Sequence, residues 1–342
     1  MTPMTFTGSG LERLSPVRQQ SEALAAAFAE AETRFVPIWQ SRCLLQDDGL
    51  VVCRREDLEL LASSHEAAVF LGRRAGQALF AIQLQGNAPP ATLPAEGFRG
   101  LREVVGAVSE ADAALLAYAR AMILWQERHR YCGVCGAPNR ASEGGFVMAC
   151  TNRDCDHKSF PRIDPAVIVL VHRGDRCLLG RQATWPEGRF STIAGFVEPG
   201  EALEDAVLRE VHEETNIRVG DCTYIGSQPW PFPAAMMLGF HAVGLTEDVR
   251  CNDGELKEAR WLTRENIRAG AIGLPPQESI AFRLIETWFD AEGGAPLSSL
   301  GLDSPMFRRP APASPGARAA STIEATPKTI AHFLITAHPT II

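Results

Sequence analysis

The sequence GFVEPGEALEDAVLREVHEETNI, residues 195–217, predicts a tight turn followed by a helix with acidic residues on its apolar side. The turn is rich in glycine and proline, and the pattern becomes helical from about residue 202 to residue 215. When the helix is projected at about 100° per residue, three glutamates fall on the same side as its apolar residues. The glutamates are Glu210, Glu213 and Glu214, and the apolar residues are Leu203, Ala206, Val207 and Val211.

A run of charges on a helix is usually a solvated surface, but the geometry here argues against that interpretation. Carboxylates at the edge of an apolar face are costly to bury unless a positive charge neutralises them. Arg209 can neutralise one of them, but a single guanidinium does not balance three acids. Because carboxylate oxygens are hard ligands, the helix is predicted to bind Mg²⁺ or Mn²⁺.

The spacing of the polar residues in this stretch resembles the Nudix box. Gly195 is followed after five residues by Glu201 and, after seven more, by Arg-Glu-Val-His-Glu-Glu-Thr-Asn-Ile. One specified position differs, because the family has glycine where this chain has Asn216. Asparagine tolerates the left-handed conformation that ends many helices, so we expect this departure to be structurally mild. The resemblance implies hydrolysis of a nucleoside diphosphate linked to another group, with metal ions on the glutamates of the helix.

Four cysteines upstream of the box have the spacing of a metal site. CGVC and CTNRDC, separated by fourteen residues, contain Cys132, Cys135, Cys150 and Cys155. Four thiolates suit tetrahedral zinc and leave no coordination position open, so we expect one structural zinc ion per chain. Zinc ribbons also occur in nucleic-acid binders, and an RNA-binding role stays open because basic residues surround this cluster. They are Arg128, Arg130, Arg140, Arg153 and Lys158.

Composition limits the class of protein further. The 342 residues are 46% apolar and 22% charged, which is enough for two or three domain cores. A formal net charge of −8 excludes a generally cationic surface for nucleic acid or an anionic membrane. The sequence has no apolar run of the roughly twenty residues that a membrane-spanning helix needs, and no secretory signal is recognisable. We therefore expect a cytoplasmic protein with no membrane partner, and the odd number of cysteines, nine, argues against a disulfide framework.

Periodic and irregular segments predict an α/β protein with five regions. Short apolar stretches at 50–53 and 78–82 predict a small N-terminal sheet, and an uninterrupted apolar face predicts a helix over 110–128. The final fifty residues are rich in Pro, Ala, Ser and Gly. The regions are a flexible leader at 1–21, a smaller N-terminal α+β domain at 22–127, a zinc ribbon at 128–160, a catalytic domain at 161–290 and a disordered tail at 291–342.

Within the catalytic domain, the patterns around the box predict strands on both sides of the helix and a second helix at the end. Residues 165–173 and 176–182 predict a hairpin, and residues 190–196 predict a further strand. Residues 221–245 predict two strands around a proline-rich corner, and residues 279–289 predict a closing helix.

The order of the four-cysteine module, the box and SQPWPFP at residues 227–233 resembles the NADH pyrophosphatase family. The resemblance extends over residues 131–289 and more thinly over 22–130. It implies a Nudix α/β/α sandwich with a mixed sheet, preceded by a zinc ribbon and a Nudix-like N-terminal domain. Members of this family hydrolyse NADH or NAD+ to AMP and nicotinamide mononucleotide, and some remove NAD caps from RNA.

The same resemblance implies roles for individual residues. Glu210 and Glu214 would hold metal together with the carbonyl of Ala194, and Arg209 belongs to the catalytic group. Glu213 and Glu255 are two candidates for water activation or further metal contact, and the sequence does not rank them. Phe160 and Phe196 would stack on the purine. The implied nucleotide pocket comprises Gln228, Pro229, Trp230, Pro231, Phe232, Pro233, Ala234, Ala235 and Ala281, with Ala235 replacing a serine of the family pattern.

Without the resemblance, Trp230 and Phe232 would be interpreted as core aromatics. Proline alternating with aromatic residues makes a stiff segment, which suits presentation of rings to a base or to a neighbouring subunit. In the family that the chain resembles, this segment contributes to the composite site of a dimer, so the resemblance implies a homodimer. No GxGxxG motif follows a predicted strand, so a dinucleotide would be the substrate rather than a bound redox cofactor. Two alternatives remain: a Nudix hydrolase of another ADP-linked metabolite such as ADP-ribose, and a non-catalytic zinc-ribbon RNA-binding protein.

Overall fold

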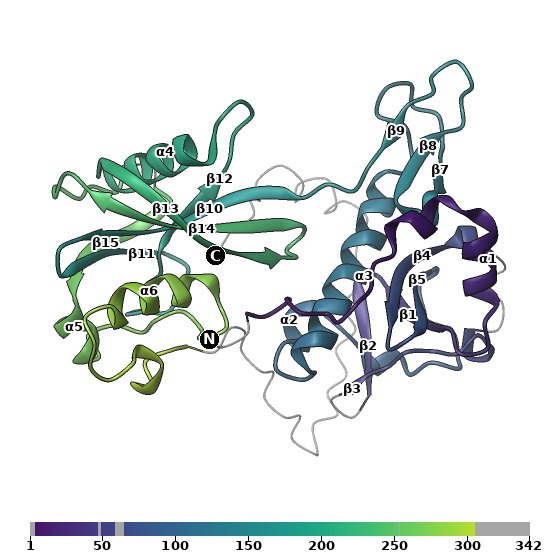
Figure 1. Ribbon diagram of the computed structural model, residues 1–342, viewed down its shortest axis with the longest axis horizontal. Helices are drawn as coiled ribbons and strands as arrows, with labels where there is room; N and C mark the ends of the chain where they lie inside the picture. The colour runs from purple at the N-terminus through teal and green to yellow at the C-terminus, as the bar shows by residue number, and fades with distance from the viewer. Residues whose placement is uncertain (1–3, 47–48, 59–64, 253, 305–342) are drawn as a thin grey trace, which may run out of the picture.

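Helix α4 (Leu203–Thr215), which carries the glutamates, packs against a mixed sheet in the C-terminal half of a computed structural model. The structure describes residues 4–46, 49–58, 65–252 and 254–304. Figure 1 shows this half, in green, beside an N-terminal half in purple and blue, with a small third sheet projecting next to the latter. The helix predicted over residues 202–215 is confirmed as α4, to within one residue.

The sheet of the C-terminal half has the order β13-β14-β10-β11-β15, with β12 paired to β10. Strand β10 pairs in parallel with β14 and antiparallel with β11 and β12, which confirms the predicted hairpin and the further strand. The parallel pairing of β10 with β14 and the strand β15 were not predicted. The bounds are β10 (Asp164–Arg173), β11 (Arg176–Gln182), β12 (Ile193–Phe196), β13 (Val219–Trp230), β14 (Ala235–Gly244) and β15 (Leu256–Thr263).

Two helical layers cover the two faces of this sheet. Alternate residues of β10 belong to two separate cores: Val167 and Val169 pack with α4, while Ile168 and Leu170 pack with α6 (Ile280–Asp290). Because both faces are covered, β10 has apolar residues at successive positions and does not alternate between apolar and polar residues. The helix predicted over residues 279–289 is confirmed as α6, and the short helix α5 (Arg264–Arg268) follows β15. The α/β/α sandwich with a mixed sheet is therefore confirmed.

The end of α4 explains why asparagine is accepted at the one position that departs from the box. Asn216 has φ 62° and ψ 5°, which is the left-handed conformation expected at a helix end. Its side-chain Nδ2 donates a hydrogen bond of 3.0 Å to the carbonyl of Asp248. The backbone path that glycine would take is therefore retained, and the side chain gains a partner.

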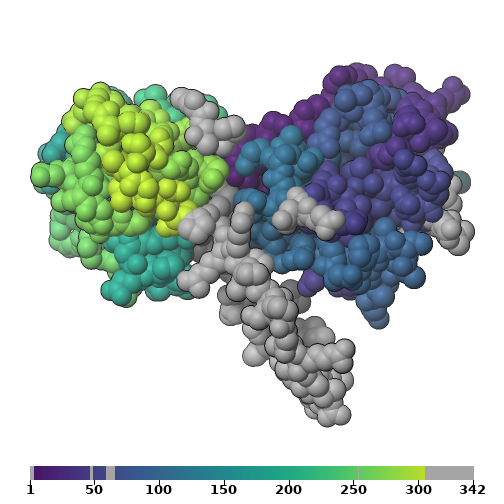
Figure 2. Space-filling view, turned by 90° about the horizontal axis from the view of Figure 1, so that it is seen from below, coloured from purple at the N-terminus to yellow at the C-terminus, as the bar shows by residue number. Residues whose placement is uncertain are grey.

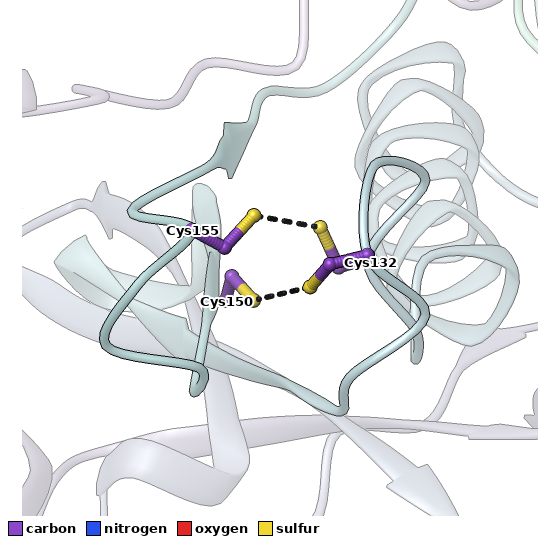
Figure 3. A group of neighbouring side chains, drawn as sticks. Cys132, Cys150 and Cys155 are labelled. Carbon is purple, nitrogen blue, oxygen red and sulfur yellow. Dashed lines mark hydrogen bonds between the residues drawn. The ribbon is translucent and has the colours of Figure 1, made fainter.

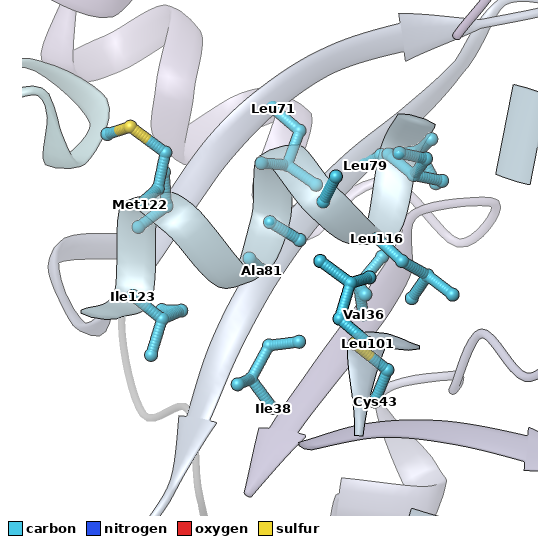
Figure 4. Close-up of a cluster of buried hydrophobic side chains, with 14 of the residues drawn as sticks. Val36, Ile38, Cys43, Leu71, Leu79, Ala81, Leu101, Leu116, Met122 and Ile123 are labelled. Carbon is cyan, nitrogen blue, oxygen red and sulfur yellow. The ribbon is translucent and has the colours of Figure 1, made fainter. Parts of the chain in front are cut away.

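The N-terminal half repeats the layered plan. Its sheet has the order β3-β2-β1-β5-β4, with β6 paired to β2, and helices α1 and α3 cover opposite faces. Figure 4 shows the core on the α3 side, where Leu116, Met122 and Ile123 lie against Val36 and Ile38. The helix predicted over 110–128 is confirmed. The bounds are α1 (Ser21–Ala29), β1 (Arg34–Trp39), β2 (Arg42–Gln46), β3 (Gly49–Leu50), β4 (Ala68–Arg74), β5 (Gln77–Leu84), β6 (Phe98–Arg99), α2 (Leu101–Val104) and α3 (Glu110–Arg128).

The cysteine-bearing module is a small antiparallel sheet that lies between α3 and β10 along the chain. Its strands β7 (Asn139–Ser142), β8 (Val147–Cys150) and β9 (Lys158–Ser159) pair in chain order. Such a short sheet has little core of its own, so its loops need a cross-link.

Residues 4–20 differ from the expected flexible leader. Thr5 and Phe6 are 1% and 3% exposed, and Glu12 forms a β-bridge with Arg73 of β4. One buried aromatic side chain, the backbone hydrogen bond from Thr5 to Glu278 and a short backbone pairing are enough to order a segment whose composition is typical of a loop. We call residues 4–12 the N-terminal strap. Of the rest of the expected leader, residues 13–21 are described and include a 3-10 helix at Ser15–Gln19, whereas residues 1–3 lie outside the described residues.

The segment after α6 also packs further than expected. Leu297 is 1% exposed, and Leu274 forms a parallel β-bridge with Asp303. The described chain therefore stays attached to the C-terminal half through residue 304, and the remainder of the predicted tail, 305–342, lies outside the described residues. Among the helices that the structure describes, none has the length and apolar character needed to cross a membrane.

Candidate active site and zinc ribbon

The carboxylate of Glu210 lies where helix α4 contacts strand β12. Its side chain is 12% exposed, and a Cβ atom added at Gly195 would lie only 1.9 Å from its Cδ atom. Glycine at position 195 therefore provides the space that the carboxylate occupies. Burial raises the pKa of Glu210, repulsion from Glu213 and Glu255 acts in the same direction, and Arg209 opposes both.

The other acids predicted for the site differ in their exposure. Glu214, one helical turn after Glu210, is 3% exposed, whereas the Glu213 side chain is 54% exposed. Two of the three glutamates thus lie within the packed face and the third lies at its edge. Glu255, just before β15, is exposed, and its charge contributes to raising the pKa of Glu210.

Arg209 connects the acids of the helix to the loop before it. Its Nε donates to Glu201 Oε1 at 2.6 Å, and its Nη1 lies 2.9 Å from Glu210 Oε1 and 3.1 Å from Glu213 Oε2. Its Nη2 donates to the carbonyl of Phe196 at 2.9 Å. The hydrogen bonds from Arg209 lower the pKa of Glu201 to about 2. One guanidinium therefore fixes the loop, the end of β12 and two glutamates of α4.

This set of groups suits a hard divalent cation by charge and ligand type. Arg209 contacts three carboxylates with a single positive charge, and Glu214 adds a further acid in a buried position. Carboxylate and carbonyl oxygens, including that of Ala194 beside Gly195, are the ligands that Mg²⁺ and Mn²⁺ prefer. Among the described residues, the carboxylates of this site do not lie as close together as the four thiols of the ribbon do. The Nη1 atom of Arg209 contacts both Glu210 and Glu213.

The four cysteines of the ribbon converge on one point. Their Sγ atoms all lie within 4.8 Å of one another, with 3.8 Å between Cys132 and Cys155 and 3.4 Å between Cys135 and Cys150 (Figure 3). Four sulfurs at the usual zinc–sulfur distance in a tetrahedron are roughly 3.8 Å apart, so this geometry fits zinc.

Local backbone structure supports the same assignment. The amide of Val134 donates to the Cys132 sulfur and the amide of Asn152 donates to the Cys150 sulfur, both at 3.4 Å. A backbone hydrogen bond at Ala137 lowers the pKa of the Cys135 thiol to about 7, as suits a metal-bound thiolate. All nine cysteines are free thiols in the structure.

The residues predicted to bind the nucleotide fall into three environments. Phe160, between β9 and β10, is 63% exposed, while Phe196 is partly buried against the core beneath α6. Gln228 is fully buried, and its amide bonds to the carbonyls of Thr5 and Glu278 and to the amide of Ile280. The amide of Gln228 is thus engaged inside the protein. Buried positions are also found for Pro231, Ala235 and Ala281, and half-buried positions for Pro229, Trp230, Phe232, Pro233 and Ala234.

The proline-rich corner lies at the boundary between the two halves. Trp230 packs against the core beneath α6, whereas Phe232 packs against the core of the N-terminal half. Arg120 of α3 donates a hydrogen bond of 3.0 Å to the carbonyl of Pro231, and the Arg102 guanidinium lies 4.3 Å from the centre of the Phe232 ring. Sequence reasoning missed these contacts because they join residues more than a hundred positions apart.

Comparisons with known proteins agree with this arrangement. Sequence profiles match as "NADH pyrophosphatase-like rudimentary NUDIX domain" over residues 32–125, "NADH pyrophosphatase zinc ribbon domain" over 127–160 and "NUDIX domain" over 162–284. NAD-capped RNA hydrolase NudC of Mycobacterium bovis is 39% identical over 302 residues, which are 83% of this chain and 94% of that protein. Human NAD-capped RNA hydrolase NUDT12 is 39% identical over 196 residues, 53% of this chain and 42% of that protein. A crystal structure of a NUDIX hydrolase from Nitrosomonas europaea aligns with a TM-score of 0.39 and 24% identity over 49% of this chain and 94% of that one.

The sandwich, with its box helix, the partly buried Glu210 and the buried Glu214, defines a hydrolase of the Nudix class. A second sandwich at the N-terminus and a four-cysteine ribbon distinguish it from Nudix proteins that consist of the catalytic domain alone. The chain belongs to the NADH pyrophosphatase family of zinc-ribbon Nudix hydrolases.

Proposed function

We propose that this protein is a metal-dependent hydrolase that cleaves the pyrophosphate of NADH or NAD+ to AMP and the corresponding nicotinamide mononucleotide. Water adds to one phosphorus, and the bridging P–O bond breaks. The observation that carries the proposal is the position of Glu210, which is partly buried beside Gly195, and of Glu214, which is buried one helical turn later, in a chain that also has the ribbon and the N-terminal sandwich of its family. The names of the relatives favour a second substrate with the same linkage, the NAD cap of an RNA.

The acids of α4 divide into groups that would hold metal and groups that would handle protons. Glu210, Glu214 and the carbonyl of Ala194 would hold Mg²⁺ or Mn²⁺. Such an ion, when bound, neutralises pyrophosphate charge and lowers the pKa of a coordinated water. Arg209 keeps Glu210 and Glu213 in fixed positions through its Nη1 atom. Glu213 and Glu255 are both exposed enough to accept a proton from water, and both remain candidates for that role.

The substrate would lie over the corner of β13 and β14. We propose that Phe160 and Phe196 stack on the purine and that the proline-rich segment lines the nucleotide pocket, with Ala281 at its α6 edge. Gln228 would support the pocket from inside, because its amide is engaged with the backbone of two other segments, the strap at Thr5 and the start of α6 at Glu278 and Ile280. The absence of a hydroxyl at Ala235 removes one polar contact that the family pattern provides.

We further propose that the protein acts as a cytoplasmic homodimer. Four large apolar side chains at or next to the ends of the zinc ribbon are exposed, which is typical of an interface. They are Tyr131 at 67%, Val134 at 69%, Phe160 at 63% and Ile163 at 60%. Light scattering coupled to size exclusion, at several protein concentrations, tests the oligomeric state; a monomer at all concentrations contradicts the proposal.

One assay tests the activity directly. The purified protein is incubated with NADH, NAD+ or ADP-ribose in the presence of Mn²⁺ or Mg²⁺, and the products are resolved by mass. We expect AMP and reduced nicotinamide mononucleotide from NADH, and neither product from the Glu214→Gln variant. Faster turnover of ADP-ribose would instead favour the alternative substrate class.

An RNA with a 5′ NAD cap provides a further comparison in the same assay. Cap removal by the wild type and binding without cleavage by Glu214→Gln support the second substrate. Salt-dependent RNA binding with no hydrolysis of any of these compounds by the wild type would favour a non-catalytic RNA-binding protein.

A further inference from the structure

The N-terminal strap joins the two halves of the molecule. Met4 packs against the core beneath α6, and Phe6 lies in the core of the N-terminal half. The amide of Thr5 donates to the carbonyl of Glu278 at 3.1 Å, and further along the strap Glu12 pairs with Arg73 of β4. Figures 1 and 2 show this segment, in purple, running between the two halves.

The strap also reaches the corner that joins β13 to β14, residues 231–234, which we call the 231–234 turn. The rings of Phe6 and Phe232 meet edge to face, with their centres 5.9 Å apart and an angle of 69°. The carbonyl of Thr5 accepts a hydrogen bond of 3.1 Å from the side-chain amide of Gln228. The strap therefore contacts both the turn and the strand that leads into it.

The N-terminal half holds the same turn from a second side. Arg120 donates to the carbonyl of Pro231 at 3.0 Å and to the carbonyl of Ser41 at 2.8 Å, so it ties the turn to the N-terminal sheet. The guanidinium of Arg102 covers the face of the Phe232 ring at 4.3 Å. Phe232 thus lies among Phe6, Arg102 and Trp230, whose ring centre is 5.4 Å from its own.

We propose that Phe6 and Arg102 are positioning residues for substrate binding, because they hold the 231–234 turn, and with it Trp230, in the conformation that receives the dinucleotide. This inference rests on the proposed function, in which the proline-rich segment lines the nucleotide pocket. A loop that is already held in its binding conformation loses less entropy when the substrate binds. Loss of the Phe6 ring would free the turn and weaken binding, while the acids of α4 would be unaffected.

Kinetics and hydrogen exchange of the full-length protein test this inference. For Phe6→Ala we expect KM for NADH to rise roughly five- to tenfold, with kcat within about twofold of wild type. Arg102→Ala removes an exposed contact, and we expect a KM increase of roughly two- to threefold without a change in melting temperature. In both variants the amides of Trp230, Phe232 and Ala234 should exchange faster than in the wild type.

Phe28→Ala is the matched control. Phe28 is 5% exposed and meets Phe35 and Phe80 edge to face at 5.3 and 5.2 Å, in the core on the other face of the N-terminal sheet. It should lower the melting temperature without changing KM or the exchange of the turn. Wild-type KM and exchange in Phe6→Ala and Arg102→Ala, or an equal KM increase in Phe28→Ala, would overturn the inference. If the wild type does not hydrolyse NADH, the proposed function fails, and the exchange data still decide whether the strap holds the turn.

Discussion

Replacing Gly195 with alanine should displace the Glu210 carboxylate by a distance that the structure defines. The added Cβ would lie 1.9 Å from Glu210 Cδ, and ordinary contact begins at 3.4 Å, so the carboxylate must move by about 3.4 − 1.9 = 1.5 Å. A misplacement of about 1 Å in an active site costs on the order of 10²-fold in rate. We therefore expect kcat of Gly195→Ala to fall at least about 100-fold, which corresponds to about 2.7 kcal/mol in the activation free energy.

The assay is steady-state hydrolysis of NADH with saturating Mn²⁺, together with thermal melting. Melting should change little, because the colliding atoms belong to the end of a flexible side chain and not to the backbone. Gly226→Ala is the matched control, since its Cβ would meet Ile280 at an ordinary 3.7 Å, and it should retain wild-type kcat. A Gly195→Ala enzyme within threefold of wild type would refute the reasoning that glycine is required there to make room for Glu210.

Three further variants test other parts of the site. Glu214→Gln should lower kcat by at least about 100-fold with an unchanged melting temperature, because it removes a buried acid that we propose as a metal ligand; normal turnover contradicts that role. Cys132→Ser should release zinc to a chromogenic chelator and melt earlier, and retained zinc with normal melting would exclude a structural clamp. Glu201, whose pKa is lowered from 4.5 to about 2, stabilises the folded state when ionised, so this contribution is complete above about pH 4.5 and is lost as the pH falls through about 2. Melting of Glu201→Gln should therefore depend less on pH in this range than that of the wild type, and parallel profiles would disprove the linkage.

Local patterns were sufficient to predict the elements around the box. Helices α3, α4 and α6 were placed to within a residue or two because their apolar faces, caps and flanking glycines are all local features. The left-handed Asn216 and the convergence of the four thiols were also predictable, since each depends on residue type and short spacing. The exposure of Glu213 shows the limit of a helical projection, because a residue at the edge of a face can lie on either side of the boundary.

Contacts between distant segments could not be predicted in this way. The parallel pairing of β10 with β14 brings together strands whose register no local pattern specifies. The strap was expected to be loose because its composition is that of a loop, and its order comes from Met4 and Phe6 packing against two different cores and from the backbone hydrogen bonds of Thr5. That Arg209 can neutralise an acid of the helix was predicted, but its bonds to Glu201 and to the carbonyl of Phe196 required the folded chain.

The two sandwiches differ most in one of their covering helices, which is α3 in the N-terminal half and α4 in the C-terminal half. Under α3 the buried face is wholly apolar, with Leu115, Leu116 and Ile123 at most 2% exposed, so this helix only adds to stability. The buried face of α4 contains Glu210 and Glu214 among its apolar residues, and each acid lowers stability unless a cation compensates it. A bound divalent cation would compensate the two acids, so the composition of α4 fits the proposed catalytic role of the C-terminal half. Among the described residues of the N-terminal half no acid is buried, which fits the role we propose for this half as a rigid support of the 231–234 turn.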